Sequence, residues 1–136
     1  EFIDTDDLIA LDAGMSIPEI FERFGEARFR EYEREAISRA ANRGGQIIAT
    51  GGGAVLDARN MRAFKRTSRI YLLDRPLTAL PREGRPLSQG ENALKRLFKE
   101  RQPLYQEHCD VRIDNSESIE NAVKKIMEDF YEAADY

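Results

Sequence analysis

Two carboxylates stand close together at the end of the first apolar run of the chain. Phe2 and Ile3 lead directly into Asp4 and Asp6. Open parallel sheets bind their ligands at the carboxyl ends of the strands. Residues two apart in a strand point to the same side, so both carboxylates are expected to face one site, one near a metal ion and one near a hydroxyl. A helix N-cap with acids favoured by the helix dipole is the alternative that these residues leave open.

Three consecutive glycines follow a second apolar run. Gly51, Gly52 and Gly53 come directly after the strand candidate that ends at Thr50. Because glycine has no Cβ, a ligand can closely approach the backbone N–H groups of such a turn. A tight turn needs one glycine, seldom three, so the run favours a ligand contact, although a purely conformational role stays open.

Arg101 lies on a helical stripe that is otherwise apolar. It follows Leu94, Leu97 and Phe98 by seven, four and three residues, which is the spacing of one helix face. A guanidinium in that position needs an anion. The sequence leaves open whether the anion is a ligand or a structural Asp or Glu, or whether the side chain extends to the helix edge.

Two further arginine sites suit anion recognition. Glu33 follows Arg30 by three residues, so on a helix it can hold the guanidinium toward a carboxylate or a phosphate. A solvated charged face is the commoner fate of such a run. Arg82 and Arg85 lie in a stretch rich in Pro and Gly, where they could close over a phosphate, although arginines in loops are ordinary.

The elements expected to position these residues alternate between short strands and longer helices. This alternation is typical of a parallel-sheet α/β domain, in the order β, α, α, β, α, β, loop, α, β, α. Ser16, Asp57 and Ser118 are expected to cap helices. Residues 74–90 predict a lid-like loop, because the stretch exceeds ordinary connections. The predicted strands are Phe2–Asp4, Gln46–Thr50, Arg69–Leu73 and Asp110–Asp114.

Composition excludes several classes of protein. The formal net charge of −4 lacks the basic excess of a nucleic-acid-binding protein. No apolar stretch approaches the roughly 18 residues of a membrane span. The one cysteine, Cys109, cannot close an intrachain disulfide, and no segment resembles a signal peptide, so we expect a cytoplasmic protein. His108 and Cys109 have no partner at metal-ligand spacing and are interpreted as structural.

Taken in order, six runs of the sequence resemble motifs of the shikimate kinase family over nearly the whole chain. The family's patterns are F-x-D-x-D, G-x-S-I-x-E-I-F, G-E-x-x-F-R-x-x-E, G-G-G-A-V, R-P-L and R-x-P-L-Y. They match Phe2–Asp6, Gly14–Phe21, Gly25–Glu33, Gly51–Val55, Arg85–Leu87 and Arg101–Tyr105. Six motifs in the right order make a chance match improbable.

The resemblance implies a fold and an activity. The expected fold is a three-layer α/β/α, parallel-sheet P-loop kinase fold of the nucleoside-monophosphate-kinase type, formed by residues 1–136 as one domain with 74–90 as its lid. The implied reaction transfers the γ-phosphoryl group of ATP to the 3-hydroxyl of shikimate with Mg²⁺, a step of chorismate and aromatic amino-acid biosynthesis. The implied partners are therefore small molecules, without nucleic acid or membrane.

The resemblance also implies roles for the residues around the transferred group. Asp6 would bind the shikimate hydroxyls and orient or deprotonate the attacking one, while Asp4 would hold Mg²⁺ through water. Arg85 would reach the ATP phosphates as the lid closes, which makes it both a catalytic and an ATP-binding residue.

A second group of implied roles concerns the carboxylate of the substrate. Arg30 and Arg101 would clamp it, supported by the backbone of the glycine run Gly51–Gly53, above all Gly52 and Gly53. Glu33 would orient Arg30. The clamp would supply the anion that the apolar stripe around Arg101 calls for.

Two departures from the family stand out. The pattern G-x-x-x-x-G-K-[ST], which cradles the β- and γ-phosphates, does not occur in the sequence, and residue 1 is Glu. We therefore expect the family's first strand, loop and helix, roughly 30 residues, to precede Phe2, and the chain by itself to be weakly active or inactive. Arg82 stands closer to Arg85 than the lid arginines of the family usually do, so it receives no role.

The sequence leaves other interpretations of the function open. One is a non-catalytic shikimate-binding domain, and another is a related small-molecule kinase such as gluconate kinase. The chain could also be one piece of a fused pathway enzyme. A sheet without its central strand could self-associate through an exposed edge.

Overall fold

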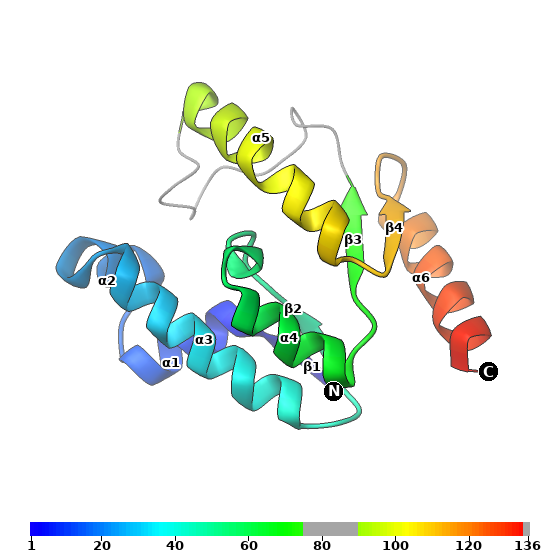
Figure 1. Cartoon of the computed structure of the whole chain (residues 1–136), viewed down its shortest axis with the longest axis horizontal. Helices are drawn as coiled ribbons and strands as arrows, with labels where there is room; N and C mark the ends of the chain where they lie inside the picture. The colour runs from blue at the N-terminus through cyan, green and yellow to red at the C-terminus, as the bar shows by residue number, and fades with distance from the viewer. Residues whose placement is uncertain (75–89, 135–136) are drawn as a thin grey trace.

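A computed structural model describes residues 1–74 and 90–134 of the chain. Figure 1 shows how the elements are arranged. In chain order they are β1 (Phe2–Asp4), α1 (Thr5–Ala13), α2 (Ile17–Phe24), α3 (Glu26–Asn42), β2 (Ile47–Ala49), the short 3₁₀ helix η1 (Ala54–Leu56), α4 (Ala58–Thr67), β3 (Tyr71–Asp74), α5 (Glu91–His108), β4 (Val111–Asp114) and α6 (Ile119–Ala134).

The strands pair in parallel, as the alternating sequence pattern predicts. β1 pairs with β2, with Asp4 opposite Ala49, and β3 pairs with β4, with Asp74 opposite Asp114. Within the described residues these are two separate two-stranded sheets. Parallel pairing places the carboxyl ends of β1 and β2 at the same edge, so the chain that follows each strand begins next to the other.

The expected helix caps are confirmed. Ser16 Oγ accepts a hydrogen bond from the Glu19 backbone N–H at 3.3 Å, and Ser118 Oγ accepts one from the Asn121 N–H at 3.1 Å. Asp57 caps α4 by accepting from the Arg59 N–H at 2.9 Å. Each cap satisfies an N–H group that has no partner inside its helix, which is why these residues mark the helix starts in the sequence.

One helix was missed by the sequence interpretation. The predicted order has two helices between the first two strands, whereas the structure has three, because α1 begins immediately after β1. Its apolar residues lie on more than one side of the helix and show no helical period: Ile9 is fully buried while Leu11 is largely exposed. The expectation that Asp4 and Asp6 share one side of a strand is therefore wrong, since Asp6 lies in the first turn of α1.

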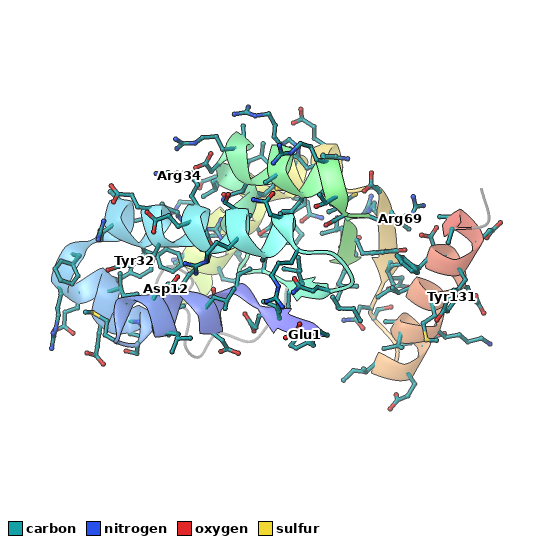
Figure 2. The ribbon with its side chains drawn as sticks, turned by 90° about the horizontal axis from the view of Figure 1, so that it is seen from below. Glu1, Asp12, Tyr32, Arg34, Arg69 and Tyr131 are labelled. Atoms are coloured by element: carbon teal, nitrogen blue, oxygen red, sulfur yellow. The ribbon has the colours of Figure 1, made fainter. Side chains whose placement is uncertain are left out.

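Helix α3 lies at the centre of the N-terminal half. Its apolar face contributes to two core clusters, one shared with α1 and α2 and one with η1 and α4. Figure 2 shows α1 and α3 side by side, with Asp12 and Tyr32 labelled. Asp12 also forms an ion pair with Arg39 of α3. The position of Arg30 is therefore fixed by the packing of its own helix.

Helix α6 lies at one end of the molecule, beside β4 (Figures 1 and 2). Asp129 joins it to β3 by accepting from the Arg69 guanidinium at 2.6 Å and from the Tyr71 hydroxyl at 2.7 Å. The hydrogen bonds to Asp129 are the main cause of the raised pKa of Arg69. Another face of α6 is apolar and at least 47% exposed at five positions: Ile119, Val123, Met127, Phe130 and Tyr131. This set is called the α6 apolar face below.

Three further expectations concern the lid, a membrane span and the cysteine. Residues 75–89, which hold Arg82, Arg85 and nearly all of the expected lid, lie outside the described residues. Among the helices that the structure describes, none combines the length and the apolar character needed to cross a membrane. Cys109 is a free thiol that faces the backbone carbonyl of Gln106.

Candidate active site

The glycine turn after β2 is the centre of the candidate site. It runs from Gly51 to Gly53 and ends where η1 begins. A Cβ built on any of its three glycines would lie within 3.4 Å of a polar side chain. Those side chains come from three helices. They include Asp6, Arg30 and Arg101, the side chains that the sequence resemblance implies would bind the hydroxyls or the carboxylate of shikimate. The absence of Cβ atoms therefore lets the functional groups approach the backbone directly.

Asp6 approaches the turn from the first turn of α1. Its Oδ1 would lie 3.2 Å from a Cβ on Gly51. The parallel pairing of β1 with β2 brings about this contact, because the chain leaves both strands at the same edge. Asp6 is half-buried. A carboxylate here can accept a hydrogen bond from, or take a proton from, a hydroxyl held over the glycine turn.

Asp4 forms the helix cap that was the open alternative for this residue. Its Oδ1 accepts from the Asp6 backbone N–H at 2.9 Å, which leaves Oδ2 outside that bond. No group of three or more His, Cys, Asp or Glu residues suited to a metal ion occurs in the described part of the chain. Magnesium characteristically keeps several waters and takes only one or two carboxylates together with substrate phosphates. A single carboxylate that acts through water fits that requirement.

Arg30 approaches the turn from α3. A Cβ on Gly53 would clash with Nη1 and Nη2 of Arg30 and lie 2.7 Å from its Cζ, so the guanidinium turns the edge with its two terminal nitrogens toward bare backbone. Arg30 Nη1 donates to Glu33 Oε1 at 2.9 Å, as the three-residue spacing predicts, and Nη2 donates to Glu26 Oε1 at 3.3 Å. These two bonds fix the plane of the guanidinium.

Glu33 is a buried carboxyl in the middle of this group. Its side chain is 1% exposed, and its Oε2 has no hydrogen-bond partner among the described residues. Burial raises the pKa of Glu33, and the positive charges of Arg30 and Arg101 oppose that rise. The charge of Asp6 acts on the same carboxyl. Glu33 therefore responds to the three ionised groups that surround the glycine turn.

Arg101 and Tyr105 approach from α5. Arg101 Nη1 would lie 3.3 Å from a Cβ on Gly52, and the Tyr105 hydroxyl donates to the Gly52 carbonyl oxygen at 2.6 Å. Leu94, on the same stripe, is buried, as expected. Arg101 Nε is buried without a hydrogen-bond partner, and no ion pair joins this arginine to another described residue. The structural Asp or Glu partner considered from the sequence is therefore not found in the described part of the chain.

Three contributors to the site were missed by sequence reasoning. Tyr105 lies within the R-x-P-L-Y match, four residues after Arg101, and that helical spacing could have indicated it. Glu26 lies four residues before Arg30, which is also a helical spacing. Asn60 is fully buried and donates from Nδ2 to the Ala54 carbonyl at 3.0 Å, which anchors the end of the turn. Nothing in the sequence pattern around Asn60 indicates this contact.

The chain matches the shikimate kinase family model over residues 1–131. It is 44% identical to a shikimate kinase of Stenotrophomonas maltophilia over 122 residues, which cover 84% of this chain and 68% of that protein. It is 40% identical to the shikimate kinase of Symbiobacterium thermophilum over 142 aligned residues, covering 96% of this chain and 82% of the relative.

Solved structures agree with the sequence relatives. The shikimate kinase of Acinetobacter baumannii, solved in complex with shikimate, superposes with a TM-score of 0.89 at 32% identity, covering 98% of this chain and 79% of that one. The shikimate kinase of Aquifex aeolicus superposes with a TM-score of 0.83 at 29% identity, covering 98% of this chain and 82% of that one. The expected P-loop kinase α/β fold class is thereby confirmed. The sequence, its family model and its structural neighbours all show that the chain belongs to the shikimate kinase family.

Proposed function

We propose that this protein binds shikimate over the Gly51–Gly53 turn and provides the acceptor side of phosphoryl transfer from ATP to the 3-hydroxyl of shikimate. The observation that carries this proposal is the convergence of Asp6, Arg30 and Arg101 on three consecutive glycines. A carboxylate and two guanidinium groups around bare backbone suit a ligand with hydroxyls at one end and a carboxylate at the other.

Each group has a distinct task in the proposed site. Arg30 and Arg101 bind the carboxylate of the substrate, and the backbone N–H groups of the glycine turn add neutral donors. Glu33, with Glu26 outside it, keeps the Arg30 guanidinium in its plane. Asp6 orients the attacking hydroxyl and accepts its proton. This geometry positions the acceptor, which is most of what a protein contributes to phosphoryl transfer.

The donor side of the reaction rests on fewer residues of this sequence. The family takes ATP as its phosphate donor, and Asp4 is the residue that would hold Mg²⁺ through water. When bound, the ion would neutralise charge on the phosphate oxygens. Arg85, outside the described residues, remains our proposal for a lid arginine that reaches those phosphates. Residues 1–136 include no G-x-x-x-x-G-K-[ST] loop, so transfer is tested in a protein that carries such a loop upstream of Phe2.

Asp6→Asn in such a loop-bearing protein tests the proposal. We expect the parent protein to form shikimate 3-phosphate from ATP and shikimate. The variant should lose at least about a hundredfold in kcat with a much smaller change in shikimate KM, because the amide keeps the site's shape but accepts no proton. Asp7→Asn, one residue along the same helix turn, is the matched control. Unchanged turnover of Asp6→Asn would remove Asp6 from the mechanism, and phosphorylation of gluconate in place of shikimate would identify the alternative kinase.

We further propose that the protein acts in the cytoplasm as a single domain with small-molecule partners. The α6 apolar face and the separate sheets are the features that favour self-association. Fusion to another pathway enzyme is decided by the sequence encoded on either side of residues 1–136.

A further inference from the structure

Tyr105 makes a specific contact with the glycine turn, and the proposed function gives this tyrosine no role. Its hydroxyl donates to the carbonyl oxygen of Gly52 at 2.6 Å, and it would lie 2.9 Å from a Cβ built on the same glycine. The contact joins α5 to the glycine turn at the peptide between Gly52 and Gly53. A short bond of this kind to a glycine, which has the greatest backbone freedom of any residue, restricts that freedom strongly.

The geometry of the peptide unit extends the effect of this bond to the next residue. A peptide group is planar and trans, so its carbonyl and its N–H point in opposite directions. When the Tyr105 hydroxyl fixes the direction of the Gly52 carbonyl, it also fixes the direction of the Gly53 N–H. No hydrogen bond links that N–H to another residue in the described ranges 1–74 and 90–134. The donor is therefore oriented and available.

The oriented peptide lies between the two arginines of the site. A Cβ on Gly52 would approach Arg101, and a Cβ on Gly53 would approach Arg30. An anion that bridges these guanidinium groups thus meets the Gly52–Gly53 backbone. On the other side of the turn, Asn60 already anchors the Ala54 carbonyl, so the peptide that Tyr105 holds is the remaining adjustable part.

Helix α5 itself also needs this contact. Arg101 and Tyr105 are four residues apart and lie on one helix face, but Pro103 stands between them. A proline inside a helix removes one backbone hydrogen bond and favours a bend, so the helix alone holds the two side chains together less rigidly. The bond from Tyr105 to the turn compensates, because it fixes the helix where Arg101 emerges from it.

We propose that Tyr105 is a positioning residue for the substrate carboxylate, one that aims the Gly53 N–H and keeps Arg101 in register with the glycine turn. The role rests on the proposed function, since it presupposes that the anion between the arginines is the carboxylate of shikimate. Tyr105 acts through Gly52 and Arg101 and does not itself contact the reacting atoms.

Tyr105→Phe tests this role because it removes one hydroxyl and keeps the ring. Calorimetric titration of the protein with shikimate should show binding weakened by about tenfold, the loss expected from one misaligned hydrogen bond to a charged group. Tyr131→Phe, a hydroxyl removed from the exposed face of α6, is the matched control and should leave the affinity unchanged. Equal affinities for wild type and Tyr105→Phe would overturn the proposal.

A second readout separates positioning from simple stabilisation. In ¹⁵N NMR spectra at saturating shikimate, the Gly53 amide proton of the wild type should shift downfield, and the shift should be smaller in Tyr105→Phe. A merely structural tyrosine would lower the melting temperature yet leave both the affinity of the folded protein and this shift unaltered. That pattern would also refute the proposal.

The proposal stays testable if Tyr105→Phe does not fold or if the wild type does not bind shikimate. If Tyr105→Phe does not fold, Gly52→Ala replaces it, because the new Cβ would lie 2.9 Å from the hydroxyl and must displace it. Unchanged shikimate affinity in Gly52→Ala would then contradict the proposal. If the wild type binds no shikimate at all, the proposed function fails, and the role of Tyr105 fails with it. That result is distinct from a wild type and a variant that bind equally well.

Discussion

Arg101 is the residue whose surroundings best separate a binding role from a structural one. An arginine on an apolar stripe requires a counter-charge, and in the described part of the chain no acid forms an ion pair with it. Arg30, in contrast, already has Glu33 and Glu26 as partners. Burying a guanidinium nitrogen without a hydrogen-bond partner costs free energy. A bound anion would offset that cost. The two arginines of the site thus predict different responses to substitution.

Arg101→Met keeps the length of the side chain and removes the charge. The melting temperature of the ligand-free protein should stay the same or rise, because Arg101 forms no ion pair with a described residue and the buried Glu33 keeps Arg30 as its ion-pair partner. The stabilisation that shikimate gives should disappear, because half of the carboxylate clamp is gone. Thermal unfolding with and without shikimate measures both effects. A drop of several degrees in the ligand-free protein, with the shikimate-induced rise preserved, would show that Arg101 is structural.

Arg30→Met is the comparison that makes this prediction sharper. It should destabilise the ligand-free protein by about 3 kcal/mol, since it leaves the buried carboxyl of Glu33 without its ion-pair partner. Urea unfolding at neutral pH checks the difference. If both arginine variants lowered the stability equally, the distinction between a prepaired and an unpaired arginine would be wrong.

Several features of the site could be predicted at the residue scale, and others could not. The Arg30–Glu33 contact follows from helical spacing, because residues three apart share a helix face. The role of Asp4 stayed ambiguous, because a cap and a metal ligand call for the same residue type at a strand-to-helix junction. Asn60 could not be found from the sequence, since its partner, the Ala54 carbonyl, carries no side-chain signal.

At the scale of elements, the helix starts carry much of the local specificity. Asp57 caps α4 and lies beside Arg59 and Arg34. The hydrogen bond from Arg59 is the largest cause of the lowered pKa of Asp57. Capping residues have a distinctive sequence signal, which explains why Ser16, Asp57 and Ser118 were all located correctly. Helix α1 was missed because its apolar residues lie on more than one side and give no period.

The lowered pKa of Asp57 predicts a pH dependence of stability. In the unfolded chain this carboxyl takes up a proton near its ordinary value of 3.8, whereas in the folded protein it does so only at lower pH. Between the two values the unfolded state binds more protons, so the contribution of Asp57 is fully present above about pH 4 and is lost as the pH falls through the folded pKa.

Asp57→Asn isolates that contribution because asparagine also caps helices. The variant should be less stable than the wild type by about 1 kcal/mol at neutral pH, and the difference should shrink as the pH falls below 3.8. Thermal unfolding of both proteins from pH 7 to pH 2.5 measures it. A stability difference that does not change with pH would mean that the charge of Asp57 contributes nothing.

At the scale of the whole molecule, the two separate parallel sheets and the α6 apolar face both leave large apolar side chains exposed. The order and parallel direction of the strands were predictable from the alternation of short apolar runs with helices. Their division into two pairs agrees with the expected sheet that lacks its central strand, but the sequence pattern did not indicate which strands pair. Large apolar side chains at both places, Ile47 and Leu73 on the strands and Phe130 on α6, remain exposed.

This exposed apolar surface predicts concentration-dependent self-association of the 136-residue protein. Met127→Lys places a charge in the middle of the α6 apolar face and should shift the equilibrium toward the monomer. Ser38→Lys, on the exposed side of α3, adds the same charge elsewhere and should not. Sedimentation velocity over a hundredfold range of concentration distinguishes them. An equal effect of both lysines would show that net charge, and not this face, governs association.

We propose that the Gly51–Gly53 turn, with Arg30 and Arg101 beside it, recognises the carboxylate of shikimate. Calorimetric titration of the protein with shikimate, and with the neutral carboxamide analogue of the same ring, tests it most directly. The analogue keeps every hydroxyl and nearly the same shape, so only the charge facing the two guanidinium groups changes. We predict saturable binding of shikimate and at least about a hundredfold weaker binding of the carboxamide, the loss expected when a charge-assisted pair is replaced by a neutral contact. Equal affinity for the two ligands would show that the two guanidinium groups do not recognise the carboxylate.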